Sequence, residues 1–212
     1  MAVAAAVILS ASLAACAPPR QAEATSPEDS ARLAAAWAAG REAALAAALP
    51  MPAADQIEAH EFTWHDAQRG REVLARLYLP AADARASARR PLPLVVFSHG
   101  IGGSRSGYTY LGKHWAAQGY ASLHLQHVGS DRALWAGNPL TLLGRLQGAA
   151  SESEAVDRAH DWRFALDQLL ASPHGAHIDT ARIVAAGHSY GANTTLLVAG
   201  ARVPRDGRLI DL

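Results

Sequence analysis

The segment Gly187-His188-Ser189-Tyr190-Gly191 follows the pattern G-x-S-x-G. In a nucleophile elbow this pattern makes a sharp turn from a strand into a helix, which lifts the serine hydroxyl clear of the sheet. A side chain at either glycine would collide with the neighbouring backbone. Because the pattern also arises by chance, its context decides: it follows an expected strand over 182–186 and opens into an expected helix over 192–199. We therefore predict that Ser189 is a nucleophile.

A second glycine-rich segment, Ser98-His99-Gly100-Ile101-Gly102-Gly103, follows a short apolar run over 94–97. Hydrolases with an elbow place such a loop here, where its small residues let backbone N–H groups face the oxygen that becomes negative in the transition state. One preorganised donor is worth about 3 to 4 kcal/mol. We predict the N–H groups of Ile101 and Tyr190 as the two donors. The alternative is that Gly100, Gly102 and Gly103 only turn the chain.

The elements around these segments alternate between strand and helix. The apolar run over 94–97 has the composition of a strand buried on both faces. A helix over 108–118, ended by Gly119, and a strand over 121–125 follow it, and a hairpin over 57–79 precedes it. Ser151 and Glu154 form a capping box for a long helix that ends before Pro173. The pattern predicts a doubly wound, mostly parallel α/β sheet.

Over 93–200 the chain resembles the α/β hydrolases related to dienelactone hydrolase and platelet-activating-factor acetylhydrolase. The resemblance rests on PLVVFSHGIGGSRSGYTYLGKHWAAQGYASLHLQHVGSD, on WRFALDQLL and on RIVAAGHSYGANTTLLVAGA. It implies hydrolysis of small-molecule or lipid carboxylic esters through an acyl-serine intermediate, without a metal or organic cofactor. It carries over Ser189 as nucleophile and the amides of Ile101 and Tyr190 as oxyanion donors.

The remaining members of a catalytic triad have no match in this sequence. In this fold the acid and then the histidine follow the serine on later loops. No histidine occurs among residues 190–212, and Asp206 and Asp211 come too early for the acid. We expect the hydrolase core, 56–212, to lack the last strands and helices of the fold. A serine without its base is a weak nucleophile, so we expect little or no activity from the chain as given.

Composition and the other histidines exclude several classes of partner. The formal net charge is zero, which does not favour binding of nucleic acid. His124 and His127, like His174 and His177, have a spacing that could suggest a metal site, but no carboxylate stands at a ligand spacing. We predict no metal site. His99 is expected to organise the backbone of the oxyanion loop rather than to transfer protons.

The N-terminal residues indicate export. Residues 1–16 are apolar and small and read as a signal peptide, and Leu13-Ala14-Ala15-Cys16 resembles the lipobox of bacterial lipoproteins. We predict a protein of the bacterial cell envelope, attached to the membrane only through lipid on Cys16. The alternative is an alanine-rich extension with a chance cysteine, since no Lys or Arg precedes Cys16. Residues 17–55 are expected to form a linker and an Ala-rich helix over 30–49.

Two functions from different classes stay open at this point. The first is an ester hydrolase, with Tyr108, Tyr110 and Trp135 as candidate residues at the substrate mouth. The second is a lipid-anchored binding or scaffold protein that has kept the hydrolase fold and lost the chemistry. The sequence does not identify the ester.

Overall fold

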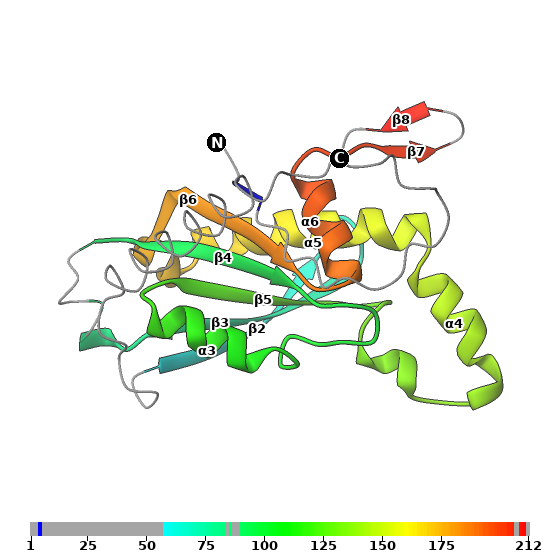
Figure 1. Ribbon diagram of the computed structural model, residues 1–212, viewed down its shortest axis with the longest axis horizontal. Coiled ribbons are helices and arrows are strands. Elements are labelled where there is room, and N and C mark those ends of the chain that lie inside the picture. Colours follow the sequence, from blue (N-terminus) through cyan, green and yellow to red (C-terminus); the bar gives the residue numbers. More distant parts are fainter. Residues whose placement is uncertain (1–3, 6–56, 84, 86–89, 206–207, 211–212) are drawn as a thin grey trace, which may run out of the picture. The chain divides into compact units, whose positions relative to one another are not determined.

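The computed structural model describes residues 4–5, 57–83, 85, 90–205 and 208–210. In this part of the chain the main sheet has six strands in the order β1-β6-β4-β5-β3-β2 (Figure 1). These strands are β1 (Ala4–Ala5), β2 (Ile57–Asp66), β3 (Arg71–Pro80), β4 (Leu92–Ser98), β5 (Ala121–His127) and β6 (Ile178–Gly187). A separate two-stranded sheet consists of β7 (Val203–Arg205) and β8 (Arg208–Ile210).

The helices alternate with the strands along the chain. The α-helices are α3 (Thr109–Ala117), α4 (Leu142–Ala149), α5 (Glu152–Ala171) and α6 (Tyr190–Val198). Short 3₁₀ helices are η1 (Arg132–Trp135), η2 (Pro139–Thr141) and η3 (Pro173–His177). Every strand and helix predicted from the sequence within the described residues is confirmed, with ends that differ by a few residues. No helix was predicted in the segment between β5 and α5, where η1, η2 and α4 are found. The short elements β1, η3, β7 and β8 were not predicted either.

The middle of the sheet is parallel and its outer hairpin is antiparallel. β4 lies between β5 and β6 and pairs in parallel with both, whereas β3 pairs in antiparallel with β2 and β5. Six of the seven residues of β4 are buried, all except Pro93, as expected of a central strand. Because β4 and β6 run in the same direction, their carboxyl ends meet at one edge of the sheet.

Helices cover both faces of the sheet. On one face Leu111 and Trp115 of α3 pack against Phe97 of β4. On the other face α5 contributes Trp162 and Leu169 to a larger core with β3, β4, β5 and β6, and α6 packs against α5 and β6. Figure 1 shows α3 on the opposite side of the sheet from α5 and α6. This arrangement confirms the doubly wound α/β architecture.

The capping box predicted at the start of α5 is half formed. The Ser151 hydroxyl accepts the N–H of Glu154 at 3.2 Å, as predicted. The Glu154 carboxylate does not return to the backbone of Ser151; it accepts the hydroxyl of Ser130 at 2.7 Å instead. The helix therefore begins where the sequence indicates. Glu154 forms a contact between α5 and the loop after β5.

Several predictions concern residues outside the described ranges. The linker and the helix over 30–49 lie there, as does Cys16. Within the expected signal peptide only Ala4 and Ala5 are described, and they pair in parallel with Val184 and Ala185 of β6. Among the described residues no helix combines the length and apolar character needed to span a bilayer.

Candidate active site

Ser189 stands at the turn between β6 and α6 in a strained backbone conformation. Its φ is 53° and its ψ is −118°, and among the described residues it is the only one other than glycine with a positive φ. A side chain in this region costs roughly 1 to 3 kcal/mol and persists only where the surroundings enforce it. Ser189 is exposed, although the residues just before it in β6 are buried. The turn therefore presents the hydroxyl at the surface, as the sequence pattern predicts.

The two glycines of the elbow are required by close backbone contacts. A Cβ atom on Gly187 would lie 2.2 Å from the carbonyl oxygen of Gly191. A Cβ atom on Gly191 would lie 1.9 Å from the carbonyl oxygen of Ser98, at the end of β4. Real Cβ contacts are never this short, so either substitution has to move backbone.

The glycine loop after β4 lies directly against the elbow. A Cβ atom on Gly100 would be 3.2 Å from the Cβ of Ser189. Gly102 has a φ of 74°, and its N–H donates to the carbonyl of Ser130 at 2.8 Å. The loop and the elbow come from distant parts of the sequence and are brought together because β4 and β6 are neighbours in the sheet.

The amides of Ile101 and Tyr190 are available to a ligand. Within the described ranges neither N–H has a hydrogen-bond acceptor, although the neighbouring amides of Gly102, Gly103 and Gly191 all have one. Tyr190 is the first residue of α6, where N–H groups point out of the helix without intrahelical partners. The elbow and the glycine loop thus each carry one unpaired amide, and an oxyanion hole needs such donors.

His99 has no free nitrogen and does not face Ser189 as a base. Its Nδ1–H donates to the carbonyl of Gly100 at 2.6 Å, and its Nε2 accepts the N–H of His127 at 3.1 Å. Burial, and next the charge of Arg158, lower the pKa of His99 to about 4. The ring is therefore neutral and fixed in one tautomer, and it orients the peptide that carries the Ile101 amide.

A buried Ser-His-Asp arrangement lies beneath the site. The Ser98 hydroxyl donates to His127 Nε2 at 3.1 Å, and His127 Nδ1–H donates to Asp161 at 3.0 Å. The connectivity is that of a catalytic triad. However, Ser98 is 1% exposed and the other two residues are 0% exposed, so no ester reaches this hydroxyl. The three residues connect β4, β5 and α5 rather than perform hydrolysis.

Asp161 is also paired with arginines from the β2–β3 hairpin. Arg69 Nη1 and Arg71 Nε each donate to its Oδ1 at 2.9 Å. Burial alone would raise the pKa of Asp161, but the hydrogen bond from His127, and then the hydrogen bonds and charge of Arg71, outweigh burial and lower the pKa. Asp161 is therefore ionised and balances two cations at the base of the site.

Sequence reasoning missed the charged residues of α5. Glu154, Arg158 and Asp161 are all buried, on a face that also carries the apolar residues Ala159 and Trp162. Their separations of four and three residues place them on one side of the helix. Charged residues at this spacing within an apolar stripe were the sequence feature that could have indicated a buried charged cluster.

The three aromatic residues predicted near the substrate mouth have different positions. Trp135 Nε1 donates to the carbonyl of Gly102 at 2.9 Å, and the indole is 59% exposed. The Tyr108 hydroxyl and His188 Nδ1 form a hydrogen bond of 2.7 Å beside the elbow. Tyr110 is 66% exposed. Thus Trp135 and Tyr108 each contact a segment of the site, and no contact of Tyr110 with either segment is seen.

Three of the four histidines weighed as metal ligands have other partners. His124 and His127 are buried, and their Nε2 atoms hydrogen-bond with Ser122 and Ser98 respectively. His174 packs against His60, with ring centroids 4.5 Å apart. Among the residues that the structure covers, no group of three or more His, Cys, Asp or Glu side chains is arranged to hold a metal ion.

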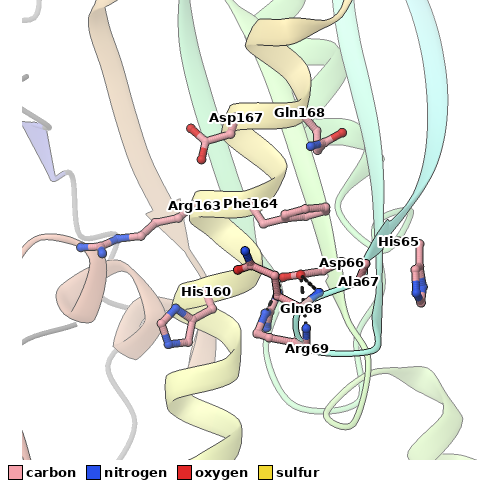
Figure 2. A pocket seen from close by; sticks show the side chains of 10 residues that line it. All are labelled: His65, Asp66, Ala67, Gln68, Arg69, His160, Arg163, Phe164, Asp167 and Gln168. Atoms are coloured by element: carbon pink, nitrogen blue, oxygen red, sulfur yellow. Dashed lines mark hydrogen bonds and ion pairs between the residues drawn. The ribbon is translucent and has the colours of Figure 1, made fainter.

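A hollow of about 660 Å³ lies away from Ser189, between the β2–β3 turn and α5 (Figure 2). Asp66 and Arg69 line it and pair with each other at 2.6 Å, and Phe164 forms an apolar wall. Neither Ser189 nor the two candidate oxyanion residues are among the lining residues. We therefore assign the candidate active site from the elbow and the glycine loop, not from this hollow.

Comparison with known proteins agrees with this fold. The family model of platelet-activating factor acetylhydrolase, isoform II, matches residues 63–137, which include the glycine loop. A ferulic acid esterase from Streptomyces cinnamoneus is 25% identical, with a TM-score of 0.56 over 71% of this chain and 57% of that chain. A dienelactone hydrolase-like promiscuous phosphotriesterase from metagenomic libraries is 18% identical, with a TM-score of 0.50 over 68% of this chain and 54% of that chain.

The chain thus spans little more than half the length of these solved structures. No curated protein matches it in sequence.

The contact between Gly191 and β4 gives a first prediction. We expect Gly191→Ala to lower the free energy of unfolding by about 2 kcal/mol or more, because the new methyl group forces the backbone apart. The matched control is Gly144→Ala in α4, where a Cβ atom meets nothing within 4 Å. That substitution should raise stability by up to about 1 kcal/mol, because alanine favours helix. Urea unfolding measures both, and equal stability of Gly191→Ala and wild type would contradict the packing described.

The buried histidines predict a pH dependence of stability. Burial lowers the pKa of His99 to about 4 and that of His124 to about 3. In the unfolded chain these rings take up protons below about pH 6.5, whereas in the fold they stay neutral. The free energy of unfolding should therefore fall as the pH decreases from about 6.5 to about 4. Each histidine contributes a loss of about 1.4 kcal/mol for every unit by which the fold lowers its pKa. The lowered pKa of Asp161 adds a further loss below about pH 4.

Urea midpoints measured at intervals from pH 7.5 to pH 4 test this dependence. His124→Gln removes one titrating ring and should give a shallower decline than wild type. A stability that stays constant over this range would mean that the imidazoles are protonated in the folded protein.

Proposed function

This chain belongs to the α/β hydrolases related to dienelactone hydrolase and platelet-activating-factor acetylhydrolase, and we propose that Ser189 is the nucleophile of a serine hydrolase that cleaves carboxylic esters. The observation that supports this best is the strained, exposed serine at a turn that lies against the glycine loop, with an unpaired amide on each of these two segments. An attack by its hydroxyl on an ester carbonyl forms a tetrahedral oxyanion. The amides of Ile101 and Tyr190 then stabilise that charge.

The reaction proceeds through an acyl-serine. The Ser189 oxygen forms a bond to the carbonyl carbon and loses its proton to a base, and the alcohol leaves with a proton as the carbonyl re-forms. Water then attacks the acyl carbon by the same path, releasing the carboxylic acid and restoring the serine. We propose small-molecule or lipid esters as substrates. The ferulic acid esterase that the chain is similar to is named for such a substrate.

The proton acceptor is the part of this mechanism that the described residues do not supply. No described side chain is hydrogen-bonded to the Ser189 hydroxyl, His99 and His127 have other partners, and no histidine follows Ser189 in the sequence. We therefore propose that these 212 residues acylate slowly. An oxyanion hole without a triad base still retains part of the rate enhancement.

A fluorophosphonate probe tests the assignment. The probe forms a covalent bond to an activated serine, so we expect slow labelling that mass spectrometry assigns to the peptide with Ser189 and not to the one with Ser98. Ser189→Ala should abolish it. Imidazole, as an external base, should increase the labelling rate of the wild type several-fold because no internal base is in place. Labelling that is absent with and without imidazole would reject the hydrolase and favour a binding or scaffold role.

We also propose that the protein is exported in a bacterium and anchored by lipid on Cys16. The support is the match of residues 13–16 to a lipobox and the apolar residues before it. In bacteria fed radiolabelled palmitate, the full gene product should carry label and sediment with membranes. Cys16→Ser should lose both properties while it is still synthesised. An unlabelled wild-type protein would contradict the anchor and leave the hydrolase proposal untouched.

A further inference from the structure

One buried guanidinium contacts both segments that carry the proposed oxyanion amides. Arg158 lies in α5 and is 0% exposed. Its Nε donates to the Thr194 hydroxyl at 2.8 Å, and its Nη1 donates to the Ser130 hydroxyl at 2.8 Å. Its Nη2 donates to the carbonyl of His99. The three acceptors belong to α6, to the loop after β5 and to the glycine loop after β4.

On the side of the glycine loop, Arg158 holds the peptide just before the one that carries the Ile101 amide. The next carbonyl, that of Gly100, accepts His99 Nδ1–H at 2.6 Å and the N–H of Gly103 at 3.1 Å. In a trans peptide the C=O and the N–H point in opposite directions. Fixing the Gly100 carbonyl therefore fixes the direction of the Ile101 N–H.

On the side of α6, Arg158 holds the residue that carries the second amide. The Thr194 hydroxyl accepts from Arg158 and donates to the carbonyl of Tyr190 at 3.3 Å. The guanidinium also lies over the Tyr190 ring, 4.8 Å from its centroid. The ring is held at its far end, where the phenol donates to the carbonyl of Ser151 at 3.1 Å. Tyr190 is thus fixed through its carbonyl, its ring and its hydroxyl.

The charge of Arg158 is compensated but costly to bury. Burial lowers the pKa of Arg158 to about 10, while the nearby Glu154 acts to raise it, so the group is protonated at neutral pH. The Ser130 hydroxyl, which accepts from Arg158, donates to the Glu154 carboxylate at 2.7 Å. An apolar residue of similar volume often gives equal or greater stability than a buried charge. Stability alone therefore does not account for an arginine at this position.

We propose that Arg158 is a positioning residue for ester cleavage, whose guanidinium sets the separation and direction of the Ile101 and Tyr190 amides. The inference rests on the function proposed for Ser189. It requires the forked geometry of arginine, because one side chain has to reach three segments at once. A lysine keeps the charge but presents a single ammonium group and does not reproduce the fork.

The first test measures the reaction of Ser189 with a fluorophosphonate in the full chain. We expect Arg158→Met and Arg158→Lys to lower the maximal labelling rate constant about 100-fold, as when one oxyanion donor is lost. The concentration for half-maximal rate should change little, because the probe still binds. Circular dichroism and thermal melting establish that each variant is folded. If Arg158 only stabilises the fold, every folded variant should have the labelling rate constant of the wild type.

A second pair of variants changes the structure less, so that a lower labelling rate is not attributable to misfolding. Thr194→Val removes the link from Arg158 to the carbonyl of Tyr190 and should lower the rate constant at least five-fold, a smaller loss than that of a whole donor. Thr195→Val is the matched control: its hydroxyl donates to the carbonyl of Gly191 at 3.0 Å, and it is also buried in α6. No hydrogen bond between Thr195 and Arg158 is present in the described structure. Its rate constant should stay within two-fold of wild type.

A second readout does not depend on hydrolysis. In Ser189→Cys the thiol stands at the start of α6 beside both amides, so we expect a thiol pKa below its ordinary value of about 8.5, measured from thiolate absorbance. Adding Arg158→Met or Arg158→Lys should raise it by about one unit, because the amides no longer converge. A lysine variant that matches arginine in both readouts would show that charge alone matters and would overturn the inference.

The two proposals fail in different ways. If wild-type Ser189 is never labelled, the hydrolase proposal fails and the thiol comparison alone decides the role of Arg158. If Ser189 is labelled and the Arg158 variants are labelled at the wild-type rate, the hydrolase proposal stands and the inference about Arg158 is rejected.

Discussion

The site depends on how closely the elbow approaches the end of β4. Gly191 leaves no room for a methyl group beside the Ser98 carbonyl, and Gly187 leaves none beside Gly191. This contact fixes the start of α6 against the glycine loop, so Ser189 is turned outward in a strained conformation that it would not adopt alone. The parallel pairing of β4 and β6 supplies the scaffold, because it places the two loops at the same edge of the sheet.

Beneath that contact, buried polar groups lie beside the apolar core of the sheet. Asp161 pairs with arginines from β3 and the β2–β3 turn, and Arg158 spans the loops above. Removing one partner of such a buried pair costs about 3 to 5 kcal/mol, because the other charge remains unpaired. A network of this kind specifies one arrangement of the loops more sharply than apolar packing does. It also makes the site sensitive to single substitutions far from Ser189.

Much of the fold was predictable from local patterns. Three local patterns each indicate an element directly: the apolar run of β4, the Ser151 cap of α5 and the glycine pattern at the start of α6. The structure contains all three elements. The segment between β5 and α5 was not predicted as helical, because its glycines and Pro139 interrupt any apolar period over η2 and α4. The charged face of α5 was missed for another reason: burial of Arg158 and Asp161 depends on partners from β3 and α6 that periodicity along one helix does not contain.

The hydrogen-bonded residues Ser98, His127 and Asp161 affect how catalytic residues are identified in such proteins from interatomic distances. A search that matches interatomic distances to a protease template would select these three residues, since both bonds lie near 3 Å. It would overlook Ser189, whose hydroxyl is hydrogen-bonded to no imidazole among the described residues. Solvent contact at the oxygen, rather than the geometry of the three hydrogen-bonded residues, distinguishes the serine that we propose as nucleophile from the buried Ser98.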